Sequence, residues 1–135
     1  MSPDLDLLDL DASGQLTLLA ARRVSAVELL KMALARHEQT HKSLNAVIAA
    51  DLERALERAK AIDDHRANDV MLGPLAGPPM TIKDTLDVIG MPASAGLEGF
   101  RRRKSEDATV VGHARRAGAV IWGKTNVPVM AGDWQ

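Results

Sequence analysis

A stretch rich in glycine and proline, Gly73–Pro79, leads directly into the short apolar run Met80–Ile82 and then into Lys83. Proline fixes the backbone angle φ and removes an amide donor, while glycine supplies backbone angles that other residues avoid, so this stretch predicts a stiff approach loop. The apolar run has strand character. A lysine held at the end of a strand and partly out of water loses its proton more easily, as a general base must. Lys83 is therefore a candidate base; the alternative is a lysine that simply reaches solvent from a strand end.

Three helices are predicted before this loop. Ser25 and Glu28 have the spacing of a capping box and indicate a helix that runs to about Thr40. A shorter helix, from about residue 13 to 22, precedes it. After a short apolar run at 46–49, the apolar positions from 52 to 62 recur with helical spacing and have charged residues between them. The first half of the chain is therefore predicted to be mainly helical.

A strand, a helix and a second strand are predicted in the second half. Asp107 is a plausible N-cap for a helix over 108–117, and Gly118 is a plausible stop. Ala119–Trp122 is then an apolar strand. The order of Met80–Ile82, this helix and this strand predicts a crossover unit in a sheet covered by helices. With 135 residues and no flexible linker, we expect one α/β unit.

Three segments resemble the amidase signature family of amide hydrolases, and they occur in the family's order: Gly73–Asp84, Gly90–Gly96 and Ala117–Asn126. The resemblance runs from roughly Asp11 to the last residue. It implies the N-terminal part of an α/β/α amidase fold, with a mixed sheet covered by helices. In that family a lysine, a serine in a cis peptide and a nucleophilic serine form the catalytic triad, and the resemblance places the lysine at Lys83.

The two serines of that triad belong to a Gly/Ser-rich segment that follows the Gly-Lys-Thr-Asn motif, and no stretch of this sequence matches it. We therefore expect residues 1–135 to be the N-terminal portion of a single amidase domain that acts on a small-molecule amide. The resemblance implies that this portion carries the base and part of the pocket wall, including Met130 and Ala131. Alone it should be inactive. It should associate with itself or with the missing portion, because strands such as Ala119–Trp122 would be left partly uncovered.

Two alternatives stay open. The chain could be a noncatalytic, self-associating module, because the serines are missing. Within the family it could belong to a glutamine amidotransferase subunit that serves transfer-RNA charging. Asn126–Gln135 looks more like general amidases, since the corresponding segment of that subunit is usually acidic and contains phenylalanine.

Gly118–Thr125 also satisfies the phosphate-loop pattern of glycine, four residues, then Gly-Lys-Thr. A phosphate loop follows a strand and opens a helix, whereas here the intervening residues are themselves the predicted strand and Pro128 follows closely. We therefore interpret Lys124 as a charge at a strand end. Asp84 is expected to brace the turn after Lys83, because neighbouring strand residues point to opposite faces and a direct ion pair between the two is disfavoured.

Composition excludes several classes. The net charge of -1 gives no general attraction to nucleic acid, and the absence of cysteine excludes disulfides and thiolate sites. The basic run Arg101–Lys104 has no aromatic neighbour beyond Phe100 and is interpreted as a solvated loop. The four histidines lack metal-ligand spacing, so no metal or other cofactor is expected. The N-terminus lacks a secretion signal and no run is long enough to span a membrane, which favours a cytoplasmic protein without a membrane partner.

Overall fold

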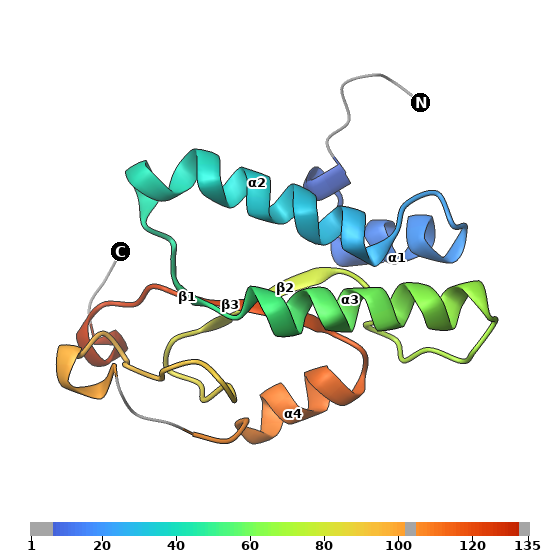
Figure 1. The fold of residues 1–135 in the computed structure, drawn as a ribbon. Helices are drawn as coiled ribbons and strands as arrows, with labels where there is room; N and C mark the ends of the chain where they lie inside the picture. The colour runs from blue at the N-terminus through green and yellow to red at the C-terminus, as the bar shows by residue number, and fades with distance from the viewer. Residues whose placement is uncertain (1–6, 102–104, 133–135) are drawn as a thin grey trace.

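A three-stranded mixed sheet forms the middle of the fold, and helices cover both of its faces (Figure 1). The structure, a computed structural model, describes residues 7–101 and 105–132. In chain order the main elements are α1 (Ala12–Ala20), α2 (Ala26–Leu44), β1 (Val47–Ala50), α3 (Leu52–Ala67), β2 (Pro79–Lys83), α4 (Thr109–Arg116) and β3 (Val120–Thr125). Short 3-10 turns at Leu7–Asp9, Glu98–Phe100 and Val129–Ala131 complete the list.

The strand order is β1-β3-β2, with β2 parallel and β1 antiparallel to the central strand. The parallel pair β2 and β3, joined through α4, confirms the predicted crossover, and the antiparallel β1 makes the sheet mixed as expected. Strand β3 begins one residue later than predicted and extends to Thr125, because β2 pairs with it from Val120 to Thr125 and β1 pairs with its last three residues. Its last residues therefore lie in the sheet rather than in a loop.

Side chains of β3 alternate between two hydrophobic cores. Val120 and Trp122 pack with α1, α2 and α3, whereas Ala119 and Ile121 pack with α4 and the loop after β2. All four residues are at most 5% exposed. The expectation that this strand would be left partly uncovered is therefore wrong, because helices of the same chain cover both of its faces.

Helix α2 begins with the predicted capping box. The Glu28 amide donates to Ser25 Oγ at 3.1 Å, and the Ser25 amide donates to the Glu28 carboxylate at 2.8 Å. The Ser25 amide, together with the Ser25 hydroxyl, which donates to the same carboxylate at 2.9 Å, lowers the pKa of Glu28. The Asp63 carboxylate, from α3, accepts the next two amides, Ala26 N at 2.7 Å and Val27 N at 3.0 Å. The free amides of the first turn are thus satisfied, and the helix runs past its predicted end at residue 40 to Leu44.

Helix α4 differs from its prediction at the start and agrees at the end. Ala108, not Asp107, occupies the N-cap position and makes no side-chain cap bond. At the C-terminus, Gly118 has φ of +104°, its amide donates to Arg115 O at 3.1 Å, and the Ala119 amide donates to Ala114 O at 3.0 Å. This is a Schellman motif, which turns the chain directly into β3.

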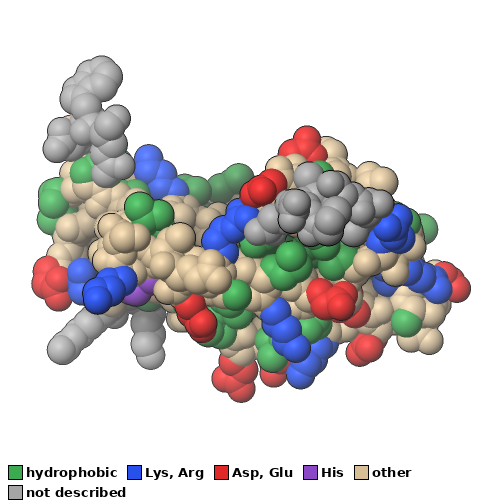
Figure 2. Space-filling model, turned by 90° about the horizontal axis from the view of Figure 1, so that it is seen from above, with side chains coloured by type: hydrophobic (Ala, Val, Ile, Leu, Met, Phe, Trp, Pro, Cys, Tyr) green, Lys and Arg blue, Asp and Glu red, His purple; other side chains and the backbone are tan. Residues whose placement is uncertain are grey.

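Charges of both signs lie among apolar side chains on the face shown in Figure 2, in keeping with the small net charge. None of the described helices combines the length and the apolarity that crossing a bilayer requires.

We expect Gly118→Ala to lower the free energy of unfolding by about 2 kcal/mol or more, because φ is left-handed there and the added Cβ would lie 2.8 Å from Ala76 Cα. Gly112→Ala, within α4, is the matched control. Its Cβ would meet only the Arg116 guanidinium, at 3.4 Å, so stability should rise by up to about 1 kcal/mol. Urea unfolding measures both variants. A Gly118→Ala protein that unfolds at the wild-type midpoint would contradict the close approach of these two segments.

Candidate active site at the ends of strands β2 and β3

A series of backbone hydrogen bonds joins four segments at one edge of the sheet. Lys83 lies opposite Thr125 in the parallel register, and the next amide, Asp84 N, donates to Thr125 O at 3.2 Å. The Ala95 amide donates to Asp84 O at 3.2 Å, and the Met130 amide donates to Ala95 O at 2.7 Å. The structure therefore brings the candidate base and the predicted wall residue Met130 to the same edge. This edge is the carboxyl end of two parallel strands, where ligand sites of α/β proteins usually lie.

Lys83 is the last residue of β2, and its side chain is exposed while those of Ile82 and Asp84 are buried. Its carbonyl accepts the Leu86 amide at 3.0 Å, which closes a turn directly after the strand. The expected withdrawal of Lys83 from water is not provided by the described residues, because its side chain points away from the layer that buries Asp84. The amine is thus available to a group from outside these residues.

Lys124 and Asp84 form an ion pair within the protein interior. The Nζ and Oδ1 atoms are 3.1 Å apart, and the side chains are 0% and 1% exposed. Lys124 Nζ also donates to Pro92 O at 3.0 Å. The Asp84 carboxylate further accepts bonds from the Ser94 hydroxyl and, at 3.4 Å, from the Ser94 amide. The Asp84 carboxylate thus holds the loop at Ser94 and the neighbouring strand, whereas the turn directly after Lys83 is closed by the backbone bond from Leu86.

Lys124 does lie near the end of a strand, as the second-to-last residue of β3, but its charge is buried and paired, which was not predicted from the sequence. Strand β3 continues past it, and the loop that contains Pro92 and Ser94 covers its side chain. Two buried unit charges are tolerated when they are paired and their remaining hydrogen-bonding groups are satisfied. The sequence carried a usable signal for this contact. Once β2 and β3 are predicted to be parallel neighbours, a lysine and an aspartate near the same ends of the two strands are candidates for a pair.

Three residues on the segments joined beside this pair have a left-handed backbone, as do Arg22, Asn45 and Asp69 elsewhere in the described chain. Ala95, Met130 and Ala131 have φ of 48°, 53° and 54°, values in the left-handed region that non-glycine residues rarely adopt. Met130 is 63% exposed and Ala131 is half-buried. Gly96 has positive φ too, and a Cβ there would lie 2.9 Å from the carbonyl oxygens of Val127 and Pro128. Strained residues held by their surroundings are often found at functional sites.

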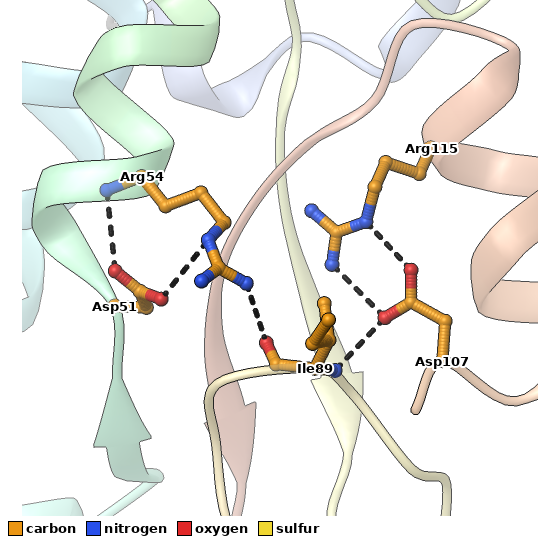
Figure 3. Close-up of polar contacts among 5 residues, drawn as sticks. All are labelled: Asp51, Arg54, Ile89, Asp107 and Arg115. Atoms are coloured by element: carbon orange, nitrogen blue, oxygen red, sulfur yellow. Dashed lines mark hydrogen bonds and ion pairs between the residues drawn. The ribbon is translucent and has the colours of Figure 1, made fainter. Parts of the chain in front are cut away.

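The loop after β2 is also held from both helical layers, at Ile89 (Figure 3). The Ile89 carbonyl accepts a bond from Arg54 Nη1 of α3 at 3.1 Å, and the Ile89 amide donates to Asp107 Oδ1 at 2.9 Å. Arg54 in turn lies 3.5 Å from the Asp51 carboxylate, and Arg115 of α4 binds Asp107 through two bonds of 2.7 and 3.1 Å. Asp107 therefore serves as a clamp on this loop instead of the helix cap that the sequence predicted.

The predicted basic run and the C-terminal segment fall partly outside the described residues. Arg101 pairs with Glu98 at 3.0 Å, while Arg102–Lys104 and Asp133–Gln135 lie outside the described residues. Among residues 7–101 and 105–132, no three histidine or acidic side chains gather as a metal site would require.

Comparisons with known proteins agree on a family. The amidase family model matches residues 28–133. A glutamyl-tRNA(Gln) amidotransferase subunit from Salinispora arenicola is 39% identical over 129 residues, which are 93% of this chain and 26% of that protein. A putative amidase of Mycobacterium bovis is 38% identical over 116 residues, which are 86% of this chain and 24% of that protein. The solved peptide amidase of Stenotrophomonas maltophilia is 30% identical, with a TM-score of 0.83, and the match covers 88% of this chain and 25% of that one.

The chain thus spans about a quarter of the length of each of these relatives. The structural match covers 88% of this chain at a TM-score of 0.83, so the predicted α/β fold class and the family resemblance are both confirmed.

The two bonds from Arg115 and the Ile89 amide hold the pKa of Asp107 below its usual value. A carboxyl group with a lowered folded-state pKa stabilises the fold above its unfolded pKa, and this stabilisation is lost as the pH falls through the folded value. We expect Asp107→Asn to lower the free energy of unfolding by about 1–2 kcal/mol near neutral pH, and this difference should shrink below about pH 4.

Urea unfolding of wild type and variant across this pH range measures the difference. Asp9→Asn removes an exposed partner of Arg36 and is the control, with little expected effect at any pH. A loss in Asp107→Asn that grows as the pH falls would contradict the assignment.

We also expect Gly118–Thr125 to bind no nucleotide, because the Lys124 ammonium is fully buried and already paired, and because a strand instead of a loop precedes it. Equilibrium dialysis with ATP and magnesium should show no saturable binding. Saturable binding with a dissociation constant on the order of micromolar, reduced by competing pyrophosphate, would contradict this expectation.

Proposed function

Because the chain belongs to the amidase family, we propose that Lys83 is the general base of an amide hydrolase whose active site includes the ends of β2 and β3. The support comes from two independent directions. Lys83 occupies the lysine position of the family's strand motif, and it stands exposed at the carboxyl edge of two parallel strands. The position of Lys83 at this edge is the observation that carries the proposal.

The proposed reaction is acyl transfer from an amide. A neutral Lys83 takes the proton of the nucleophilic serine through the second serine of the triad, and the serine oxygen attacks the carbonyl carbon. The carbon–nitrogen bond breaks, and the leaving amine takes up the proton. Water then attacks the acyl-enzyme and releases the acid. Backbone amides that stabilise the oxyanion contribute roughly 3–4 kcal/mol each in comparable hydrolases.

We propose that the two serines come from a Gly/Ser-rich segment that joins this chain at the edge described above. The exposure of Lys83 supports this assignment, since a base that must lose its proton needs a covering partner that removes water from it. Such a segment would provide both the proton to be transferred and the cover. Met130 and Ala131 are then in place as part of the substrate wall, because Met130 is bonded to the loop beside Lys83.

A second candidate is the hydrolysis of the glutamine side-chain amide within an amidotransferase. The identity of 39% to a glutamyl-tRNA(Gln) amidotransferase subunit supports it. The sequence favoured a general amidase, but relatives of both kinds match this chain to nearly the same degree, at 39% and 38% identity. Parallel assays with glutamine and with a peptide amide distinguish the two.

In a protein that joins this chain to the Gly/Ser-rich segment, Lys83→Ala should lower kcat for amide hydrolysis by about 100- to 10,000-fold. Stability should stay within about 0.5 kcal/mol of wild type, because the side chain is exposed and packs little. Lys83→Arg should be as inactive, since a guanidinium stays charged at working pH.

Lys60→Ala removes an exposed lysine of α3 and serves as the control, with full activity expected. Ammonia or amine release and circular dichroism are measured for all three variants. Activity near the wild-type level in Lys83→Ala would remove Lys83 from the mechanism.

A further inference from the structure

We propose that Lys124, Asp84 and Ser94 form a positioning network that fixes the direction of Lys83 and holds the contact between Ala95 and Met130 beside it. This inference rests on the proposed function, since it assigns the network a purpose in the site of Lys83. None of the three side chains is itself proposed to touch substrate.

The first step is that the network joins three segments at one buried point. Lys124 comes from β3, Asp84 is the residue directly after β2, and Ser94 comes from the following loop. Their exposed fractions are 0%, 1% and 3%. The carboxylate receives bonds from the lysine, from the serine hydroxyl and from the serine amide, and the lysine also holds the carbonyl of Pro92. Water does not compete for these bonds, so they hold the three segments more firmly than exposed contacts could.

The second step concerns the direction of Lys83. The bond from the Asp84 amide to Thr125 O continues the pairing of β2 with β3 by one residue beyond the strand. Neighbouring residues along such an extended chain point to opposite faces, so a side chain held inward at Asp84 directs Lys83 outward. The main chain at Asp84 is held too, because its amide donates to Thr125 O and its carbonyl accepts the Ala95 amide. A rotation of this residue would therefore break contacts of both its side chain and its backbone.

The third step leads to the strained segment. Ala95 directly follows Ser94, has φ of 48°, and its carbonyl accepts the Met130 amide at 2.7 Å. Residues in this region of backbone space persist only when their surroundings hold them. The bonds from Ser94 to Asp84 hold the start of the strained segment, and the bond to Ala95 then holds Met130.

The competing explanation is that the two charges merely satisfy each other. The two explanations differ in one respect. Buried ion pairs can often be replaced by neutral or apolar side chains without loss of stability, whereas removal of one partner alone is destabilising. A neutral pair should therefore recover stability, but it should not recover the position of the loop if the lysine bonds to Asp84 and Pro92 are what hold it.

The experiment compares Lys124→Met with the double variant Lys124→Met/Asp84→Asn in the present chain. Amide hydrogen exchange at Ala95 and Met130 reports the loop, and exchange at Ala119, bonded within the α4 terminus, reports the rest of the fold. Ile62→Ala, a cavity in the opposite core, is the control for a general loss of stability.

We expect the double variant to recover the exchange rate of Ala119 and the urea midpoint, while Ala95 and Met130 still exchange about ten-fold or more faster than in wild type. In Ile62→Ala the three amides should keep their relative rates. Two outcomes would overturn the proposal. One is that Ala95 and Met130 lose no more protection than Ala119 in Lys124→Met. The other is that both amides return to their wild-type exchange rates in the double variant.

These outcomes are independent of the assay of Lys83→Ala. Retained activity in that variant would reject the proposed function. The exchange result would then show only that the network holds the loop. In an active protein that contains this chain, the double variant should lower kcat because the network directs the base, and it should also raise KM because the network holds Met130 of the proposed substrate wall. An unchanged kcat with a raised KM would overturn the positioning of Lys83.

Discussion

The ion pair between Lys124 and Asp84 is the interaction on which the candidate site depends. It lies where the two parallel strands end, and it fastens the loop that returns over them. A lysine and an aspartate removed from water at this depth are costly unless each is fully bonded, so the surrounding loop must adopt one arrangement. The same arrangement turns Lys83 outward and leaves its amine exposed. One buried contact thus connects the fold of the sheet to the placement of the proposed base.

Two further contacts hold the same loop at Ile89, away from the ion pair. Arg54 and Asp107 hold the two sides of the Ile89 peptide, one from α3 and the other in front of α4 (Figure 3). The loop is therefore attached to the central strand, to both helical layers and, through Ala95, to the segment around Met130. Rigid support of this kind is what a catalytic group needs from residues that do not themselves react.

The sequence predicted the elements well because local signals were strong. The capping box at Ser25, the glycine stop at Gly118 and the strand-helix-strand order all correspond to local hydrogen bonding or to chain connection. The errors arose where tertiary contacts decide. Aspartate is a favoured helix N-cap residue, yet the Asp107 carboxylate accepts hydrogen bonds from Arg115 and the Ile89 amide instead. Lys124 has the sequence context of a surface charge until the loop of Pro92 is placed over it, and such long-range placement is not contained in local spacing. The exposed state of Lys83 likewise depends on what covers it.

The role of Lys83 is tested most directly by a crystal structure of an acyl-enzyme, trapped in a protein that contains this chain and the Gly/Ser-rich segment. We predict that Lys83 Nζ lies about 3 Å from a serine hydroxyl that is itself bonded to the acylated serine. We also predict that Lys124 and Asp84 are paired as they are in the structure described above. An acylated serine whose hydrogen-bonded neighbours belong to other residues, with Lys83 directed into solvent, would contradict both the mechanism and the placement of the base.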